Sequence, residues 1–141
     1  MKKILVAFDG SANALRAVRH AVQTAQENPS LKIELLHVLD PMTFTSRAAR
    51  LSPDELTRLC PDEADQMLMP ARKILEEAGI AYQLRCRVGQ AAGEIAEQVR
   101  ESDCDGIIMG TRGMGLFANV MIGSVASRVV HLVDVPVILI K

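Results

Sequence analysis

Hydrophobic residues along the chain fall into short continuous runs that alternate with longer periodic segments. The first run, Ile4 to Phe8, is too short for a helix and is followed by Asp9-Gly10-Ser11, which indicates a strand buried on both faces. Ser11 is suited to cap a helix, and alanine and valine recur at helical spacing from there towards Asn28. Further strands are predicted at residues 31–39, 80–88, 106–110 and 135–140, and further helices at 71–78, 91–101 and 124–132.

This alternation of strands and helices predicts one α/β domain over residues 1–141, with a parallel sheet and right-handed crossovers. The first strand and the strand at 106–110 are apolar at nearly every position, so both are expected in the centre of the sheet. The strand at 80–88 alternates apolar residues with polar ones, including Arg85 and Arg87, which is typical of an edge.

The last strand, Val135 to Ile140, is almost wholly apolar but carries Pro136 near its start, and proline is tolerated mainly where a backbone donor is not needed. An apolar edge without charges aggregates unless another chain covers it. The strand is therefore either an edge that pairs with a second copy, giving a homodimer, or an internal strand, and the pattern leaves both readings open.

The segment from Asp40 to Gln66 has the least regular pattern. Residues 52–55, Ser-Pro-Asp-Glu, fit a capping box with proline at the first helical position. Pro61 and Pro70 follow soon after, so we expect a broken helix and a mobile loop.

Composition narrows the class of protein. The 141 residues are 49% hydrophobic and 23% charged, which excludes a disordered chain and fits one compact domain. The 16 basic and 17 acidic side chains nearly cancel, which argues against a nucleic-acid partner. No apolar run is long enough for a membrane span or a signal peptide, so a cytoplasmic protein is expected.

The three cysteines, Cys60, Cys86 and Cys104, form no CxxC pair and are expected to be reduced thiols.

Glycines gather where the strand at 106–110 ends, in Gly110-Thr111-Arg112-Gly113-Met114-Gly115, and again at Gly123-Ser124 before the last helix. Ligands of open parallel sheets bind beyond the carboxyl ends of the strands, and a helix N-terminus attracts anions. The cluster therefore either holds a phosphate or only turns the chain. It is not a P-loop, because Leu116 stands where that motif requires lysine.

Three further residues lie near the same predicted end of the sheet. Asp9 either contacts a ribose hydroxyl or a metal-bound phosphate, or only forms an Asp-Gly turn. Arg112 either clamps a phosphate or is a solvated loop charge. Met109 either fills the core, like most of the methionines, or contacts an adenine. The histidines are scattered and no serine-nucleophile motif is present, so no catalytic residue is assigned.

Taken together, several motifs resemble those of the universal stress protein family. They are residues 4–11 (Ile-Leu-Val-Ala-Phe-Asp-Gly-Ser), Leu36-His37-Val38, and Met109-Gly110-Thr111-Arg112-Gly113, with Gly123-Ser124-Val125 following after nine further residues. The resemblance covers the whole chain and ends with Val135-Pro136-Val137. It implies a doubly wound five-stranded parallel sheet in the order 3-2-1-4-5, of the adenine nucleotide alpha hydrolase-like type, and a homodimer through Val135 to Ile140.

The full glycine pattern is similar to that of the ATP-binding branch of the family. The resemblance implies that ATP, or another adenine nucleotide, binds together with Mg²⁺ or Mn²⁺, with Asp9 as the candidate metal contact through a phosphate. It also implies a sensor or switch of the stress response. The alternatives are a slow ATPase and a nucleotide-independent interaction module. The expected nucleotide-binding residues are Ala7, Phe8, Asp9, Ser11, Val38, Met109, Gly110, Thr111, Arg112, Gly113, Gly123, Ser124 and Val125.

Overall fold

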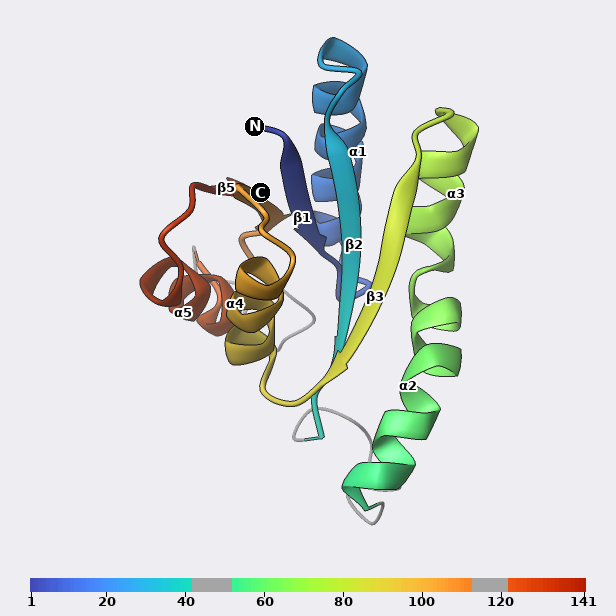
Figure 1. The fold of residues 1–141 in the computed structure, drawn as a ribbon, viewed down its shortest axis with the longest axis vertical. Helices are drawn as coiled ribbons and strands as arrows, with labels where there is room; N and C mark the ends of the chain where they lie inside the picture. The colour runs from blue at the N-terminus through green and yellow to red at the C-terminus, as the bar shows by residue number, and fades with distance from the viewer. Residues whose placement is uncertain (42–51, 113–121) are drawn as a thin grey trace.

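A computed structural model describes residues 1–41, 52–112 and 122–141 of the chain. Within these ranges it contains a parallel sheet of five strands in the order β3-β2-β1-β4-β5 (Figure 1), which confirms the predicted fold class. The strands are β1 (Lys3–Ala7), β2 (Lys32–Leu39), β3 (Tyr82–Val88), β4 (Gly106–Gly110) and β5 (Val137–Ile140). The helices are α1 (Ala12–Glu27), α2 (Pro53–Met67), α3 (Met69–Glu77), α4 (Ala91–Glu101) and α5 (Ser124–Leu132).

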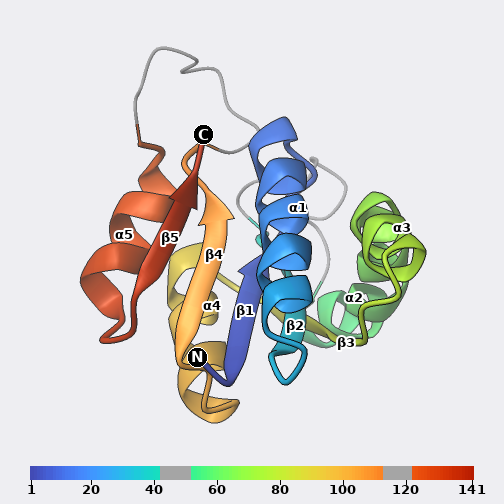
Figure 2. The same ribbon diagram turned by 90° about the horizontal axis from the view of Figure 1, so that it is seen from above.

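Helices cover both faces of the sheet (Figure 2). One apolar core joins α1 and α3 to the sheet, and a second joins α4 and α5 to the opposite face. Residues 4–6 of β1 are at most 1% exposed, because strands flank this strand on both edges and helices cover both of its faces. The central positions of β1 and β4 and the edge position of β3 are confirmed. β5 has β4 on one side and, in the described part of the chain, no strand on the other.

A buried carboxylate lies inside the second core. Glu34 of β2 is 0% exposed, and its carboxylate lies 2.9 Å from Lys3 Nζ. The same carboxylate accepts hydrogen bonds from Gln98 of α4 and from Ser102, at 2.5 and 2.7 Å. A buried charge is tolerated only where it is paired and hydrogen-bonded, so this network holds α4 in a fixed position against β1 and β2.

The expected break is wrong at Pro61 but correct near Pro70, because α2 ends at Met67 and α3 begins at Met69, with Pro70 in its first turn. The capping box at Ser52 and Glu55 forms as predicted, but α2 then continues through Pro61 as far as Met67. Its buried positions, Leu56, Cys60 and Ala64, recur every four residues, so packing of one helix face outweighs the low helix propensity of proline. Residues 42–51, where the mobile loop was expected, lie outside the described ranges.

The expectation of three reduced thiols is also wrong. Cys60 of α2 and Cys86 of β3 form a disulfide with a Cα–Cα distance of 6.1 Å. They are 26 residues apart in the chain and meet only because α2 packs on the edge strand. Cys104 is free and buried, as expected, and burial raises the pKa of its thiol to about 11.

Candidate functional site

A cavity of about 840 Å³ opens at the carboxyl ends of β1, β2 and β4. The order of the sheet reverses between β1 and β4, and in open α/β sheets ligands bind beside such a reversal. Its volume lies in the range of about 300–1,000 Å³ that is typical of small-molecule sites. Twelve of the thirteen expected nucleotide-binding residues line it, and the thirteenth, Gly113, lies outside the described ranges.

The first wall is the turn between β1 and α1. The backbone N–H of Phe8 donates to Leu36 O at 3.0 Å, which carries the pairing of β1 with β2 one residue beyond the strand. Asp9 then accepts a hydrogen bond from Ser11 N at 2.9 Å. Between them Gly10 has a φ of +87°, a conformation that glycine adopts without steric cost. This turn fixes the carboxylate of Asp9 at the cavity wall.

Ser11 caps α1 as the sequence predicts. Its hydroxyl oxygen accepts from Ala14 N at 3.1 Å and lies 3.4 Å from the carbonyl oxygen of Arg112. Next to it Asn13, which is 7% exposed, donates to Thr111 Oγ1 at 3.2 Å. The first turn of α1 is therefore joined directly to the segment that follows β4.

The second wall is formed by the end of β4 and the start of α5. Thr111 N donates to Ile140 O at 2.8 Å, and Gly123 N donates to Thr111 O at 2.6 Å. Gly123 is the N-cap of α5, and no side chain of the described residues caps this helix. The first N–H groups of a helix lack partners within the helix and carry partial positive charge, and Ser124 and Val125 beside them line the cavity. This end of the cavity is suited to an anion.

The remaining lining is mostly apolar and comes from strands and from α4. Ala7, Val38 and Met109 contribute from the three central strands, and Ala91 and Ile95 contribute from α4. A flat aromatic ring fits such a surface, because these small and aliphatic side chains offer contact area without polar groups that need partners.

Three polar residues that line the cavity were not predicted: Asp40, Asn13 and Ser127. Asp40 follows β2 as Asp9 follows β1, lines the cavity, and accepts a hydrogen bond from Ala91 N at the start of α4, at 3.4 Å. Asp9 was selected because it follows a strand at the carboxyl edge of the sheet. The same reasoning applies to Asp40, but the irregular pattern of the segment after it hid its position. Asn13 also lines the cavity, but its contact with Thr111 joins residues 98 positions apart and leaves no local signal.

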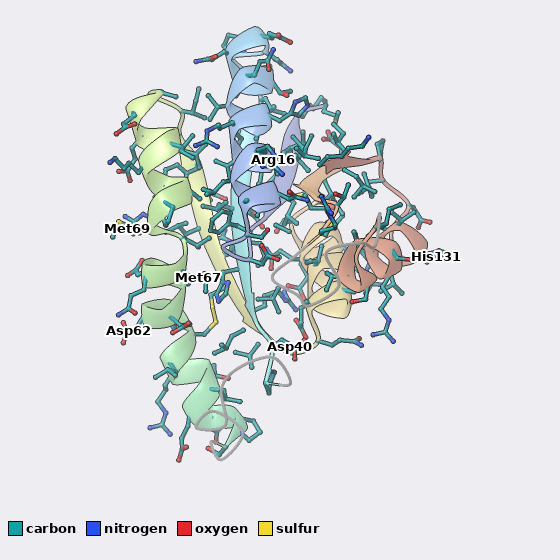
Figure 3. The ribbon with its side chains drawn as sticks, turned by 180° about the vertical axis from the view of Figure 1, so that it is seen from behind. Arg16, Asp40, Asp62, Met67, Met69 and His131 are labelled. Atoms are coloured by element: carbon teal, nitrogen blue, oxygen red, sulfur yellow. A yellow bond between two sulfur atoms is a disulfide. The ribbon has the colours of Figure 1, made fainter. Side chains whose placement is uncertain are left out.

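His37 does not line this cavity. It is 6% exposed, and neither ring nitrogen has a hydrogen-bond partner among the described residues. Burial lowers its pKa, although the Phe8 backbone and the charges of Glu63 and Asp9 oppose this effect. His131 lies on the exposed side of α5 (Figure 3), where its Nδ1 contacts Ser127 O at 2.8 Å. Neither histidine lines the cavity.

The fold and the cavity together define a single-domain, doubly wound α/β protein with a ligand crevice at the reversal of its sheet. Comparison with known proteins gives the family: the model of the universal stress protein family matches residues 1–141. The chain therefore belongs to the universal stress protein family.

Individual relatives agree with this assignment. Universal stress protein MJ0531 of Methanocaldococcus jannaschii is 31% identical over 140 residues, covering 99% of this chain and 82% of that protein. The solved structure of hypothetical protein MJ0577 has a TM-score of 0.82 at 28% identity and covers 99% of this chain and 95% of its own. A universal stress protein in complex with cAMP has a TM-score of 0.71 at 26% identity, with coverage of 99% and 97%.

Among the described residues, no helix is both long and apolar enough to cross a membrane. The same residues contain no group of three histidine, cysteine, aspartate or glutamate side chains arranged to hold a metal ion.

Proposed function

We propose that this universal stress protein binds ATP, or another adenine nucleotide, and acts as a sensor or switch. The observation that carries the proposal is the cavity itself, where the N-terminus of α5, which no described side chain caps, faces an apolar wall across the carboxyl ends of the strands. The cAMP named for one similar structure supports an adenine nucleotide as the class of ligand.

Each part of the nucleotide has a matching part of the cavity. The phosphates would lie against the N-terminus of α5, with the hydroxyls of Ser124 and Thr111 and the guanidinium of Arg112 as further donors. The adenine would pack between Ala7 and Val38, on the apolar side. Gly113, which completes the glycine pattern in the sequence, lies outside the described residues.

A divalent cation bound to the nucleotide would match the negative charge of the carboxylates in this site. Asp9 and Asp40 both line the cavity, so two carboxylates would face the phosphates of ATP. Mg²⁺ or Mn²⁺ would offset that repulsion, with phosphate oxygens as its main ligands and Asp9 as the nearest protein contact.

The cavity favours a binding role over rapid hydrolysis. The described residues that line it include no histidine, and Asp9 and Asp40 are the carboxylates among them. Asp9 is engaged by Ser11 N and Asp40 by Ala91 N. Fast ATP hydrolysis requires a group that positions and activates water, so we infer that turnover is at most slow.

ATP titration of the purified chain tests this proposal. Wild-type protein is expected to bind ATP with Mg²⁺, and Arg112→Gln to bind it about tenfold more weakly, because a charge-assisted hydrogen bond to phosphate contributes about 1.5–3 kcal/mol. Isothermal titration calorimetry at fixed salt measures both affinities.

Arg128→Gln is the matched control, because Arg128 is an exposed arginine of α5 that does not line the cavity. Its affinity for ATP is expected to equal that of wild type. Absence of ATP binding by folded wild-type protein would refute the proposal and favour a nucleotide-independent interaction module. Equal affinities of wild type and Arg112→Gln would place the phosphates elsewhere in the cavity.

We also propose that two copies of the chain pair through β5. Pro136 O and Ile140 O accept hydrogen bonds from the β4 side, and backbone groups alternate in direction along a strand. The N–H groups of Val137 and Leu139 therefore face the open edge. All four residues of β5 are partly exposed and apolar, and Val130 and Leu132 of α5 are 46% and 54% exposed.

Leu139→Arg is expected to convert a dimer into monomers, because two arginines would be brought together across the paired edges. Sedimentation equilibrium measures the change. Gln83→Arg is the control, since it adds the same charge at an exposed position of the opposite edge strand, β3. Far-UV circular dichroism checks that both variants are folded, and wild-type protein that sediments as a monomer at micromolar concentration would contradict the proposal.

A further inference from the structure

The disulfide between Cys60 and Cys86 lies outside the nucleotide site. It connects the middle of α2 to β3 and brings together residues that the chain separates by 26 positions. The Cα–Cα distance of 6.1 Å lies within the range of about 4.4–6.8 Å that disulfides occupy. Neither cysteine lines the nucleotide cavity, so the binding proposal leaves this pair without a role.

Small molecules can reach the pair. Both cysteines line a second, more open hollow whose walls are Thr57 and Pro61 of α2, Arg87 and Val88 of β3, and Glu94 of α4. Cys86 is partly exposed, whereas Cys60 is 4% exposed. Attack on a disulfide requires access of the incoming sulfur along with a suitable thiolate. Cys86 is thus the accessible member of the pair and Cys60 the buried one.

The disulfide is a large part of what holds α2 to the sheet. The apolar cluster beneath this part of α2 consists of Leu39, Leu56 and Cys60, with Cys86 and Val88 packed against it. Both cysteines belong to it, so few other apolar contacts hold this part of α2 among the described residues. By contrast α1, which has 16 residues against the 15 of α2, buries seven residues where α2 buries three. Segments with few buried contacts open locally at low cost.

Two contacts connect α2 to the walls of the nucleotide cavity. Leu39, which packs under α2, lies between Val38 and Asp40, and both of these line the cavity. At the other end of α2, a Cβ built on Gly10 would lie 2.9 Å from Met67 Sδ, so the methionine packs closely on the turn that holds Asp9. In Figure 3, Met67 is on the inner side of the helix and Asp62 on the outer side.

We propose that Cys60 and Cys86 are a reversible redox pair, which exchanges with low-molecular-weight disulfides of the glutathione type and, when oxidised, fixes α2 and strengthens nucleotide binding. The exchange has two steps. The Cys86 thiolate attacks one sulfur of the small disulfide, forms a mixed disulfide and releases one small thiolate. Cys60, as thiolate, then attacks Cys86 Sγ and releases the second. The two protons lost by the cysteines end on the two small thiols, and the electrons balance.

Redox titration of the full chain tests the exchange without any nucleotide. Protein is equilibrated with reduced and oxidised glutathione at a series of ratios, free thiols are alkylated, and mass spectrometry identifies which cysteines were linked. Cys60 and Cys86 are expected to be linked at oxidising ratios and free at reducing ones. Cys104 is the internal control and is expected to stay free throughout, because it is buried and its thiol pKa is raised to about 11. Thiols free at every ratio, or a disulfide that resists excess reduced glutathione, would overturn the proposal.

The effect on α2 and on binding is measured on the oxidised and reduced protein. Amide hydrogen exchange within Pro53–Met67 is expected to be faster after reduction, and equally fast in Cys86→Ser, whereas Cys104→Ser matches wild type in both states. ATP affinity is expected to be about fivefold or more higher in the oxidised protein. This last part rests on the proposed function: if neither state binds ATP, that function fails while the exchange result stands, and if both bind ATP equally, the coupling is refuted.

Discussion

Lys3→Met is expected to lower the free energy of unfolding by about 3 kcal/mol at neutral pH, because it leaves a buried carboxylate without its counter-ion. Glu34 is 0% exposed and Lys3 Nζ lies 2.9 Å from it, with the lysine side chain 23% exposed. That residual exposure places the expected loss at the lower end of the range for broken buried pairs. Urea unfolding followed by circular dichroism measures the loss.

At acidic pH the difference in the free energy of unfolding between wild type and Lys3→Met is expected to become smaller. Burial alone would raise the pKa of Glu34, but hydrogen bonds from Lys3, Ser102 and Gln98 hold the pKa below its ordinary value. A lowered pKa in the folded state means that the ionised carboxylate stabilises wild type above the unfolded-state pKa, and this contribution is lost as the pH falls through the folded-state value. Without Lys3 the burial effect is less opposed, so Lys3→Met loses its disadvantage as the carboxyl becomes protonated.

The double variant Lys3→Met/Glu34→Leu is the control. It removes both charges and fills the space with apolar groups, which is often neutral or stabilising for buried pairs. It is expected to regain most of the stability that Lys3→Met loses. Equal stability of Lys3→Met and wild type at neutral pH would instead mean that Gln98 and Ser102 alone satisfy the carboxylate.

Gly110→Ala is expected to cost about 2–3 kcal/mol of stability and to abolish nucleotide binding. A Cβ at Gly110 would lie 2.8 Å from Asn13 Cβ and 3.1 Å from Ala14 N. These atoms belong to the first turn of α1, so the helix itself must move, and overpacking of this kind costs about 1–3 kcal/mol. The movement would also separate Asn13 from Thr111, which forms the wall of the cavity. Thermal unfolding and ATP titration measure the two effects.

Gly93→Ala provides the matched substitution in α4. A Cβ there meets only Gln90 Oε1, at 3.7 Å, which is ordinary contact, and alanine restricts the unfolded chain more than glycine does. Stability is expected to rise by about 0.5 kcal/mol with ATP affinity unchanged. Wild-type stability and affinity in Gly110→Ala would show that α1 can shift without disturbing the cavity.

Much of this fold was predictable because its signals are local. The continuous apolar runs of β1 and β4 require burial on both faces, and the alternation in β3 requires one exposed face. Both patterns can be recognised in the sequence without knowing which residues contact one another in the folded protein. α2 was misjudged for the opposite reason, since Pro61 weakens a helix locally whereas the sheet that supports the helix face is distant in sequence. The same distance hid the meeting of Cys60 with Cys86.

The candidate site was predictable to the extent that it follows from topology. Parallel strands bring their carboxyl ends to one edge of the sheet, so Asp9 and Thr111 were expected together although 101 residues lie between them. Asn13 was missed because its place in the wall depends on how α1 lies across the end of β4, and residue spacing does not encode that packing.

The central position of β1 determines when the protein can fold. β1 pairs with β4, in the register Ile4 with Gly106, and Asp105 accepts hydrogen bonds from the backbone N–H groups of Lys2 and Lys3. A chain emerging from the ribosome therefore has its central strand ready first, but the neighbour that covers one edge of that strand is made about a hundred residues later. Closing so large a loop slows folding, and the nascent chain carries an unsatisfied strand edge throughout this interval.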